Sequence, residues 1–132
     1  MIYLKAYAFT LIAFFAIDFV WLGIVARSFY RSQLGSLMSD DVNLLAAGGF
    51  YLFYVVGIVY FAVAPAIAEG SWMRAALNGA LLGLVAYGTY DMTNLATIRG
   101  WPVAMSLVDL SWGAVLTCVS AILGFLLTRA FS

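Results

Sequence analysis

The chain has 132 residues, of which 66% are hydrophobic and only 9% are charged, and its formal net charge is zero. Because soluble domains carry about 25% charged residues, this composition predicts an integral membrane protein. The six Lys and Arg residues are scattered singly, which excludes the basic stripe of a nucleic-acid-binding protein. With no histidine and one cysteine, Cys118, the sequence also excludes His-based zinc sites, Ser-His and Cys-His catalytic pairs and an intramolecular disulfide.

Four apolar segments are each long enough for a transmembrane helix, which needs about 20 residues. They cover about residues 4–26, 43–68, 74–98 and 102–128, and we expect one domain (1–132), an all-α four-transmembrane-helix bundle. The first segment is longer than the apolar part of a signal peptide and lacks a small-x-small cleavage site, so we expect it to be retained. Both termini should then lie on one side of the membrane, here side A, opposite side B.

The connection after the first segment carries its own signals. Apolar and polar residues alternate between Phe29 and Met38, which predicts a short helix lying at the membrane interface. Ser39-Asp40-Asp41 is expected to cap the second span with a side-chain acceptor and negative charge.

The later connections are marked by proline and glycine. Pro65 and Glu69-Gly70-Ser71 are expected to end the second span, with the glycine in a left-handed C-cap and the serine capping the third span. Arg99-Gly100-Trp101-Pro102 is the last turn, with the proline in the first turn of the fourth helix.

Basic residues give no orientation, because each side of the membrane holds three of them. Side A carries Lys5, Arg74 and Arg129, and side B carries Arg27, Arg31 and Arg99.

Three aspartates, Asp18, Asp91 and Asp109, lie inside apolar segments, where an ionisable side chain costs about 2.5–3.5 kcal/mol by insertion scales. At about 1.5 Å per residue, each lies about 12–13 Å from side B. Tyr51 and Tyr54 lie about 15–20 Å from that side by the same count. Helices of opposite direction should therefore bring these polar side chains into one layer in the side-B half.

The polar residues recur at helical spacings of three and four, so we expect them to face inward, since lipid offers them no partners. Gly79-x-x-x-Gly83 predicts close approach of another helix, and it is also a candidate seam for a homodimer. The stripe of the third span comprises Gly79, Gly83, Tyr87, Tyr90, Asp91 and Asn94, and that of the fourth comprises Ser106, Asp109, Gly113, Thr117, Ser120 and Gly124.

The first and fourth spans share an Asp-x-x-Trp pattern, Asp18 with Trp21 and Asp109 with Trp112. The second and third spans similarly share a pair of tyrosines, Tyr51 and Tyr54 against Tyr87 and Tyr90. Matches this short arise from an internal repeat or from chance. In either case the carboxylates should be surrounded by aromatic rings.

Several roles fit such a cluster. The acids, tyrosines and Asn94 could satisfy one another and hold the bundle together, or Asp18 or Asp91 could pair with Arg27 or Arg99 reaching down from side B. Acids in apolar surroundings also suit proton exchange. Three carboxylates with an amide suit a hard cation such as Mg²⁺ or Ca²⁺, although no Asp-rich spacing motif supports a metal site. Carboxylates beside Trp and Tyr rings suit an organic cation.

Taken in order, these stretches resemble an uncharacterised bacterial membrane family, domain of unknown function 2177. The resemblance implies a small four-helix protein of the bacterial inner membrane with no assigned activity, so it supplies no catalytic residues. It rests on residues 18–23 (DFVWLG), 50–54 (FYLFY), 61–65 (FAVAP), 89–97 (TYDMTNLAT), 99–102 (RGWP) and 108–113 (VDLSWG).

We therefore expect a lipid-embedded protein that binds or transports a small or amphipathic ligand, with coupling to protons. The alternatives are a lipid- or isoprenoid-modifying enzyme, in which one Asp acts as general acid or base, and a purely structural or accessory protein. No cofactor is indicated. The candidate ligand-binding or proton-exchanging residues are Asp18, Asp91, Asp109, Asn94, Tyr87, Tyr90, Trp21, Trp112, Tyr51 and Tyr54.

Overall fold

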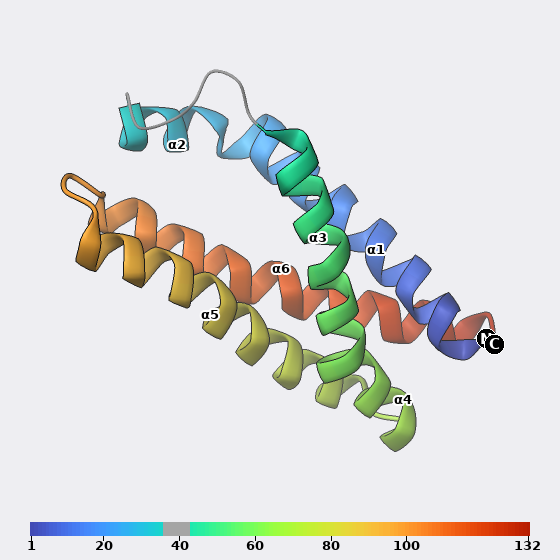
Figure 1. Ribbon diagram of the computed structural model, residues 1–132. Helices are drawn as coiled ribbons and strands as arrows, with labels where there is room; N and C mark the ends of the chain where they lie inside the picture. The colour runs from blue at the N-terminus through green and yellow to red at the C-terminus, as the bar shows by residue number, and fades with distance from the viewer. Residues whose placement is uncertain (36–42) are drawn as a thin grey trace.

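The computed structural model describes residues 1–35 and 43–132, and the regular elements of these residues are all helices, which confirms the all-α class. Helices α1 to α6 are labelled in Figure 1, and η1 and η3 are short π-helical stretches that continue the helices before them. In chain order the elements are α1 Ile2–Val20, η1 Trp21–Val25, α2 Arg27–Leu34, α3 Leu44–Ile58, η3 Val59–Val63, α4 Ala64–Glu69, α5 Trp72–Thr97 and α6 Val103–Ala130.

Of the described helices, three are long and apolar enough to cross a membrane: Ile2–Val25, Leu45–Glu69 and Val103–Ala130, with mean hydropathies of 2.3, 2.1 and 2.0. The remaining long helix, α5, has 26 residues. At about 1.5 Å per residue it is long enough to cross a bilayer. It does not reach the same hydropathy because its sequence includes Asn78, Asp91 and Asn94.

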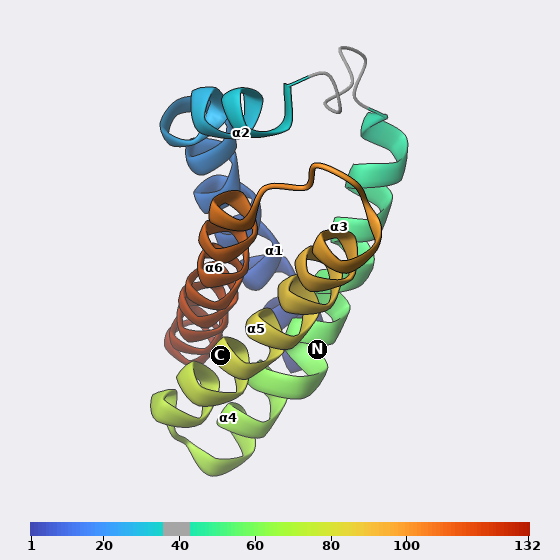
Figure 2. The ribbon, with the colours of Figure 1, turned by 90° about the vertical axis from the view of Figure 1, so that its left-hand side faces the viewer.

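The two ends of the chain lie together at one end of the bundle, where the Lys5 Nζ atom donates a hydrogen bond of 3.1 Å to the Phe131 carbonyl oxygen (Figure 1). The expected interfacial helix is α2, which lies at the opposite end (Figure 2). The later part of that expectation, Leu37 and Met38, and the expected Ser39-Asp40-Asp41 cap lie outside the described residues.

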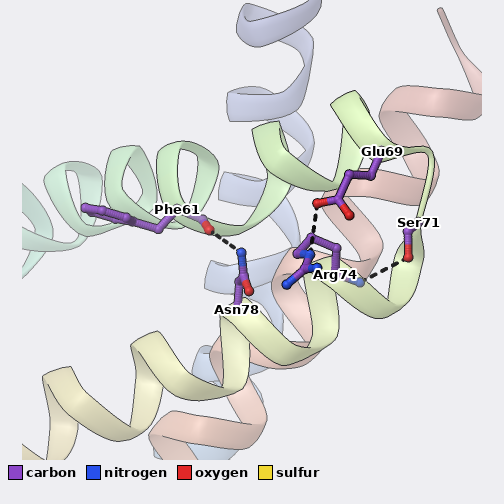
Figure 3. Close-up of polar contacts among 5 residues, drawn as sticks. All are labelled: Phe61, Glu69, Ser71, Arg74 and Asn78. Atoms are coloured by element: carbon purple, nitrogen blue, oxygen red, sulfur yellow. Dashed lines mark hydrogen bonds and ion pairs between the residues drawn. The ribbon is translucent and has the colours of Figure 1, made fainter.

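The turn between α4 and α5 confirms the two predicted caps (Figure 3). Gly70 adopts a left-handed conformation with φ of 65°, and the Ser71 hydroxyl oxygen accepts a 3.3 Å hydrogen bond from the Arg74 backbone N–H. An exposed ion pair of 2.9 Å joins the Arg74 Nε and Glu69 Oε2 atoms across the turn. At the last turn, Pro102 is the N-cap of α6 rather than a residue of its first turn, and its carbonyl accepts from the Ser106 N–H at 3.2 Å.

The second long helix ends at Glu69, next to the expected end at residue 68, and Pro65 lies within its last segment, α4. Proline has no N–H to offer the carbonyl four residues earlier, which is that of Phe61. The Asn78 side chain of α5 donates to this Phe61 carbonyl instead, at 2.9 Å (Figure 3). The irregular η3 segment and this contact together let the helix pass the proline.

Glycines bring α5 and α6 into close contact along an antiparallel hairpin (Figure 1). A Cβ atom at Gly79 would lie 2.9 Å from the Thr117 carbonyl oxygen, and one at Gly83 would collide with the Gly113 carbonyl. The predicted close approach is therefore made within the chain. Since α6 fills this seam, a homodimer would have to use another surface.

Candidate functional site

The Asp109 carboxylate of α6 is held by a side chain from α2. The Tyr30 hydroxyl donates a 2.8 Å hydrogen bond to Asp109 Oδ1, and the same hydroxyl accepts one of 3.1 Å from the Trp21 indole N–H. Tyr30 is buried, and its burial, with a smaller contribution from the Asp109 charge, raises its pKa above the ordinary tyrosine value. The hydroxyl therefore keeps its proton and remains a donor to Asp109.

The two Asp-x-x-Trp stretches meet in space. The Trp21 and Trp112 rings stack with centroids 4.3 Å apart and an interplanar angle of 11°. The Trp112 N–H donates to Asp18 Oδ1 at 3.3 Å, while the Trp21 N–H reaches Asp109 through the Tyr30 hydroxyl. Each indole N–H is thus linked to the aspartate of the other Asp-x-x-Trp stretch. That of Trp112 bonds to Asp18 directly, and that of Trp21 reaches Asp109 through the Tyr30 hydroxyl.

Asp91 of α5 is fully buried, and its two carboxyl oxygens have no hydrogen-bond donor among the described residues. The carboxyl group that interacts with Asp91 is that of Asp109. Two carboxylates are both acceptors, so they can hydrogen-bond only when one of them carries a proton. Ion pairing with Arg27 or Arg99 is not formed: both arginines are exposed, and the ion pair found among the described residues joins other side chains.

A cavity of about 500 Å³ opens beside Asp109 and is bounded by η1, α2, α3, α5 and α6. Asp109 is the acidic residue of its lining, and aromatic and aliphatic side chains form nearly all the rest. The lining residues are Leu22, Tyr30, Leu34, Ala47, Phe50, Tyr51, Tyr54, Ala86, Tyr87, Tyr90, Met105 and Asp109.

Tyr54 and Tyr87 form the wall of the cavity nearest the core. Their rings pack edge-on at 6.1 Å, and the Tyr54 hydroxyl is hydrogen-bonded to Thr117 Oγ1 at 2.8 Å. A Cβ atom at Gly113 would collide with the Tyr87 ring, so the glycine allows this ring to lie against the α6 backbone one turn after Asp109. The α6 stripe therefore positions the aromatic wall as well as the acid.

Tyr51 and Tyr90 complete the aromatic lining from α3 and α5. The Tyr51 ring lies 5.5 Å from that of Phe14 on α1, and the Tyr90 ring lies 5.9 Å from that of Trp101. Tyr90 is 56% exposed, so the cavity is open on its side.

The remaining candidate residues do not line the cavity beside Asp109. Trp21 and Trp112 line a second, separate cavity of about 430 Å³, together with Leu107, Val108, Ser111 and Val115. Asp18, Asp91 and Asn94 line neither cavity; the two aspartates are buried, and Asn94 is half-buried one turn after Asp91.

Sequence reasoning missed Tyr30, which joins Trp21 to Asp109. A signal was present, because Tyr30 and Leu34 of α2 and its N-cap residue Ala26 recur at intervals of four and so lie on one face. This face packs towards the bundle, where Ala26, Tyr30 and Met105 form a small buried cluster.

The chemistry offered is that of acids and aromatic rings. Within residues 1–35 and 43–132, no group of three or more side chains suitable for holding a metal ion is found. A carboxylate at the edge of an aromatic cavity can accept hydrogen bonds or pair with a cation, while the rings receive apolar groups.

A family model described as "Predicted membrane protein (DUF2177)" matches residues 3–126 of the chain. No curated protein and no solved structure matches it.

Proposed function

The chain belongs to the DUF2177 family of predicted membrane proteins, and from this premise we propose that it binds and transports a small amphipathic ligand within the bilayer. The proposed site is the cavity beside Asp109, with Asp91 behind it and Asp18, Trp21 and Trp112 supporting its wall. The bacterial inner membrane, expected from the family resemblance, is part of this proposal.

We propose that α5 is a fourth membrane span. The three apolar spans alone would leave the N- and C-termini on opposite sides of the membrane. The contact between Lys5 and the Phe131 carbonyl holds the two ends together, which supports a further crossing between Glu69 and Val103. The polar side chains that lower the hydropathy of α5 include Asp91, which is buried within the protein and needs no contact with lipid.

The observation that carries the ligand proposal is the cavity of about 500 Å³ with Asp109 in its lining. Ligand sites commonly have volumes of about 300–1,000 Å³, mostly apolar walls and a few polar groups that orient the ligand. An amphipathic molecule matches this lining, because its apolar part would contact rings such as Tyr51 and Tyr87 and its polar end would meet Asp109 and Tyr30.

Native mass spectrometry of the purified protein tests the proposal. We expect a co-purifying mass on the wild type that is lost from Ala47→Trp, which fills the cavity, and from Asp109→Asn, which removes its acid. The matched control is Ala8→Trp on the exposed face of α1, which should retain the mass. Retention of the same mass by both cavity variants would overturn the proposal.

The mostly apolar lining also favours a second function, a lipid- or isoprenoid-modifying enzyme in which Asp109 acts as general acid or base. The two functions differ in the fate of the bound molecule. A transporter returns it unchanged, whereas an enzyme returns a product of different mass. If the protein is structural, Asn at Asp18, Asp91 and Asp109 should lower only its stability.

A further inference from the structure

We propose that the ligand is an amphipathic organic cation and that its binding displaces a proton shared by Asp91 and Asp109. This inference rests on the proposed function and names both the ligand class and the exchanged ion. The displaced proton passes to the solvent, so charge is conserved in the site.

The acid pair lacks a hydrogen-bond donor for Asp91. Asp91 is fully buried, and neither of its carboxyl oxygens has a donor among the described residues. Its neighbour, Asp109, accepts from Tyr30 at 2.8 Å, and Tyr30 has no second proton to give to Asp91. A shared proton supplies the missing hydrogen bond and removes the repulsion between two like charges.

The described ionisable side chains around the acid pair supply no compensating positive charge. The ionisable side chains that interact with Asp109 are acids or tyrosines from α1, α2, α3 and α5, namely Asp18, Tyr30, Tyr51, Tyr87, Tyr90 and Asp91. No Lys or Arg pairs with these acids in the described parts of the chain. Without a shared proton, the pair would therefore require a cation from outside the protein.

The cavity reaches the acid pair at Asp109. Asp109 lines the cavity, whereas Asp91 does not, so a ligand in this cavity meets the pair at Asp109. Tyr51, Tyr54 and Tyr87 present aromatic surface in the same cavity, which suits both an alkyl chain and a quaternary ammonium head. A cation at Asp109 makes the shared proton unnecessary, because the cation itself compensates the second carboxylate.

Proton release on binding of decyltrimethylammonium tests the inference in neutral detergent. This probe has no titratable proton, so any proton released at saturation comes from the protein. We expect release of about one proton per wild-type protein, and an apparent affinity that falls about tenfold per unit decrease in pH while the pair holds its proton. The neutral probe decanol should release none.

Two isosteric variants separate the roles of the acids. In Asp91→Asn, the amide can donate to Asp109 in place of the shared proton, so decyltrimethylammonium should bind without proton release. In Asp109→Asn, binding of the cation should be lost. Glu69→Gln, which alters an exposed acid of the α4–α5 turn, is the control and should release protons as the wild type does.

The outcomes distinguish this inference from the proposed function. Binding of decyltrimethylammonium without proton release and without pH dependence would overturn the exchange, as would equal binding of decanol, and both would leave a ligand site in place. If neither probe binds the wild type and no mass co-purifies with it, the proposed function fails together with the inference.

Discussion

The half of the bundle that holds the termini and the half that holds α2 use the same face of α6 in different ways. Towards the termini, Gly124 packs against Thr10 of α1, and α5 approaches closely through Gly79. Towards α2, the same stripe carries Gly113, which receives the Tyr87 ring, and Asp109, which borders a cavity. One periodic stripe of small and polar residues thus makes a close helix contact at one end and a candidate site at the other.

Polarity alone does not decide where a cavity forms. Thr10, Ser120 and Thr128 are fully buried in the half near the termini, yet neither cavity includes them. The cavity beside Asp109 is instead lined by large rings, among them Tyr51, Tyr54 and Tyr87.

The largest expected effect comes from breaking the close contact. Gly83→Ala should destabilise the protein by about 3 kcal/mol, because its Cβ would collide with the Gly113 carbonyl and backbone atoms yield little. Gly88→Ala on the same helix is the matched control, since a Cβ there meets nothing within 4 Å. Unfolding in detergent micelles measures the stability of both variants, and equal stability would contradict the close contact between α5 and α6.

The next effect concerns the α2 half. Tyr30→Phe should destabilise by about 1.5 kcal/mol, because it removes the donor to Asp109 and the acceptor for Trp21. The pKa of Tyr30 is raised, so this contribution is fully present below the ordinary tyrosine pKa of about 10 and declines as the pH rises further. Unfolding of the variant and wild type from pH 8 to 11 measures it, with the exposed Tyr3→Phe as control. A difference that stays constant or grows through this range would contradict the assignment.

A smaller effect is expected where Asn78 compensates for Pro65. Asn78→Ala should cost about 1 kcal/mol, because the Phe61 carbonyl loses its donor. In a Pro65→Ala background the backbone regains an N–H for that carbonyl, so the same substitution should then cost less. A double-mutant cycle measures this coupling, and a zero coupling energy would refute the explanation.

The smallest effect is expected at the exposed ion pair between Arg74 and Glu69. Both side chains are about half-exposed, at 44% and 50%, so water and salt screen their attraction. Glu69→Gln should change stability by less than about 0.5 kcal/mol, and the difference should vanish in high salt. A loss as large as that of Tyr30→Phe would show that this turn, rather than the α2 half, limits stability.

Much of the fold follows from the sequence because lipid requires backbone groups to bond within their own helix. Apolar length predicted the helical class, and Gly70 and Ser71 predicted the caps of one turn. The count of spans is less direct, since the polar residues of α5 make it less apolar than the other three long helices. The π-helical segments η1 and η3 had no predicted counterpart, because the sequence pattern gives no local signal for them.

The hydrogen-bond partners of the acids were not predictable from the sequence. Counting residues from side B predicts that the three acids lie in one layer, since the helical rise is nearly constant, and this common depth stays a prediction. Residue counting did not predict that Trp112 would donate a hydrogen bond to Asp18, or that Tyr30 would donate one to Asp109. Both contacts depend on the angles at which α1, α2 and α6 meet. Helical spacing relates residues within one helix and carries no information on those angles.

The location of a bound cation tests the central claim most directly. In crystals grown with a bromoalkyl trimethylammonium probe, anomalous scattering identifies the bromine at the end of the tail. We predict a bromine peak inside the cavity lined by Tyr51 and Tyr87, with density for the ammonium head at Asp109. A bromine peak confined to the Trp21–Trp112 cavity or to the lipid-facing surface would contradict the account.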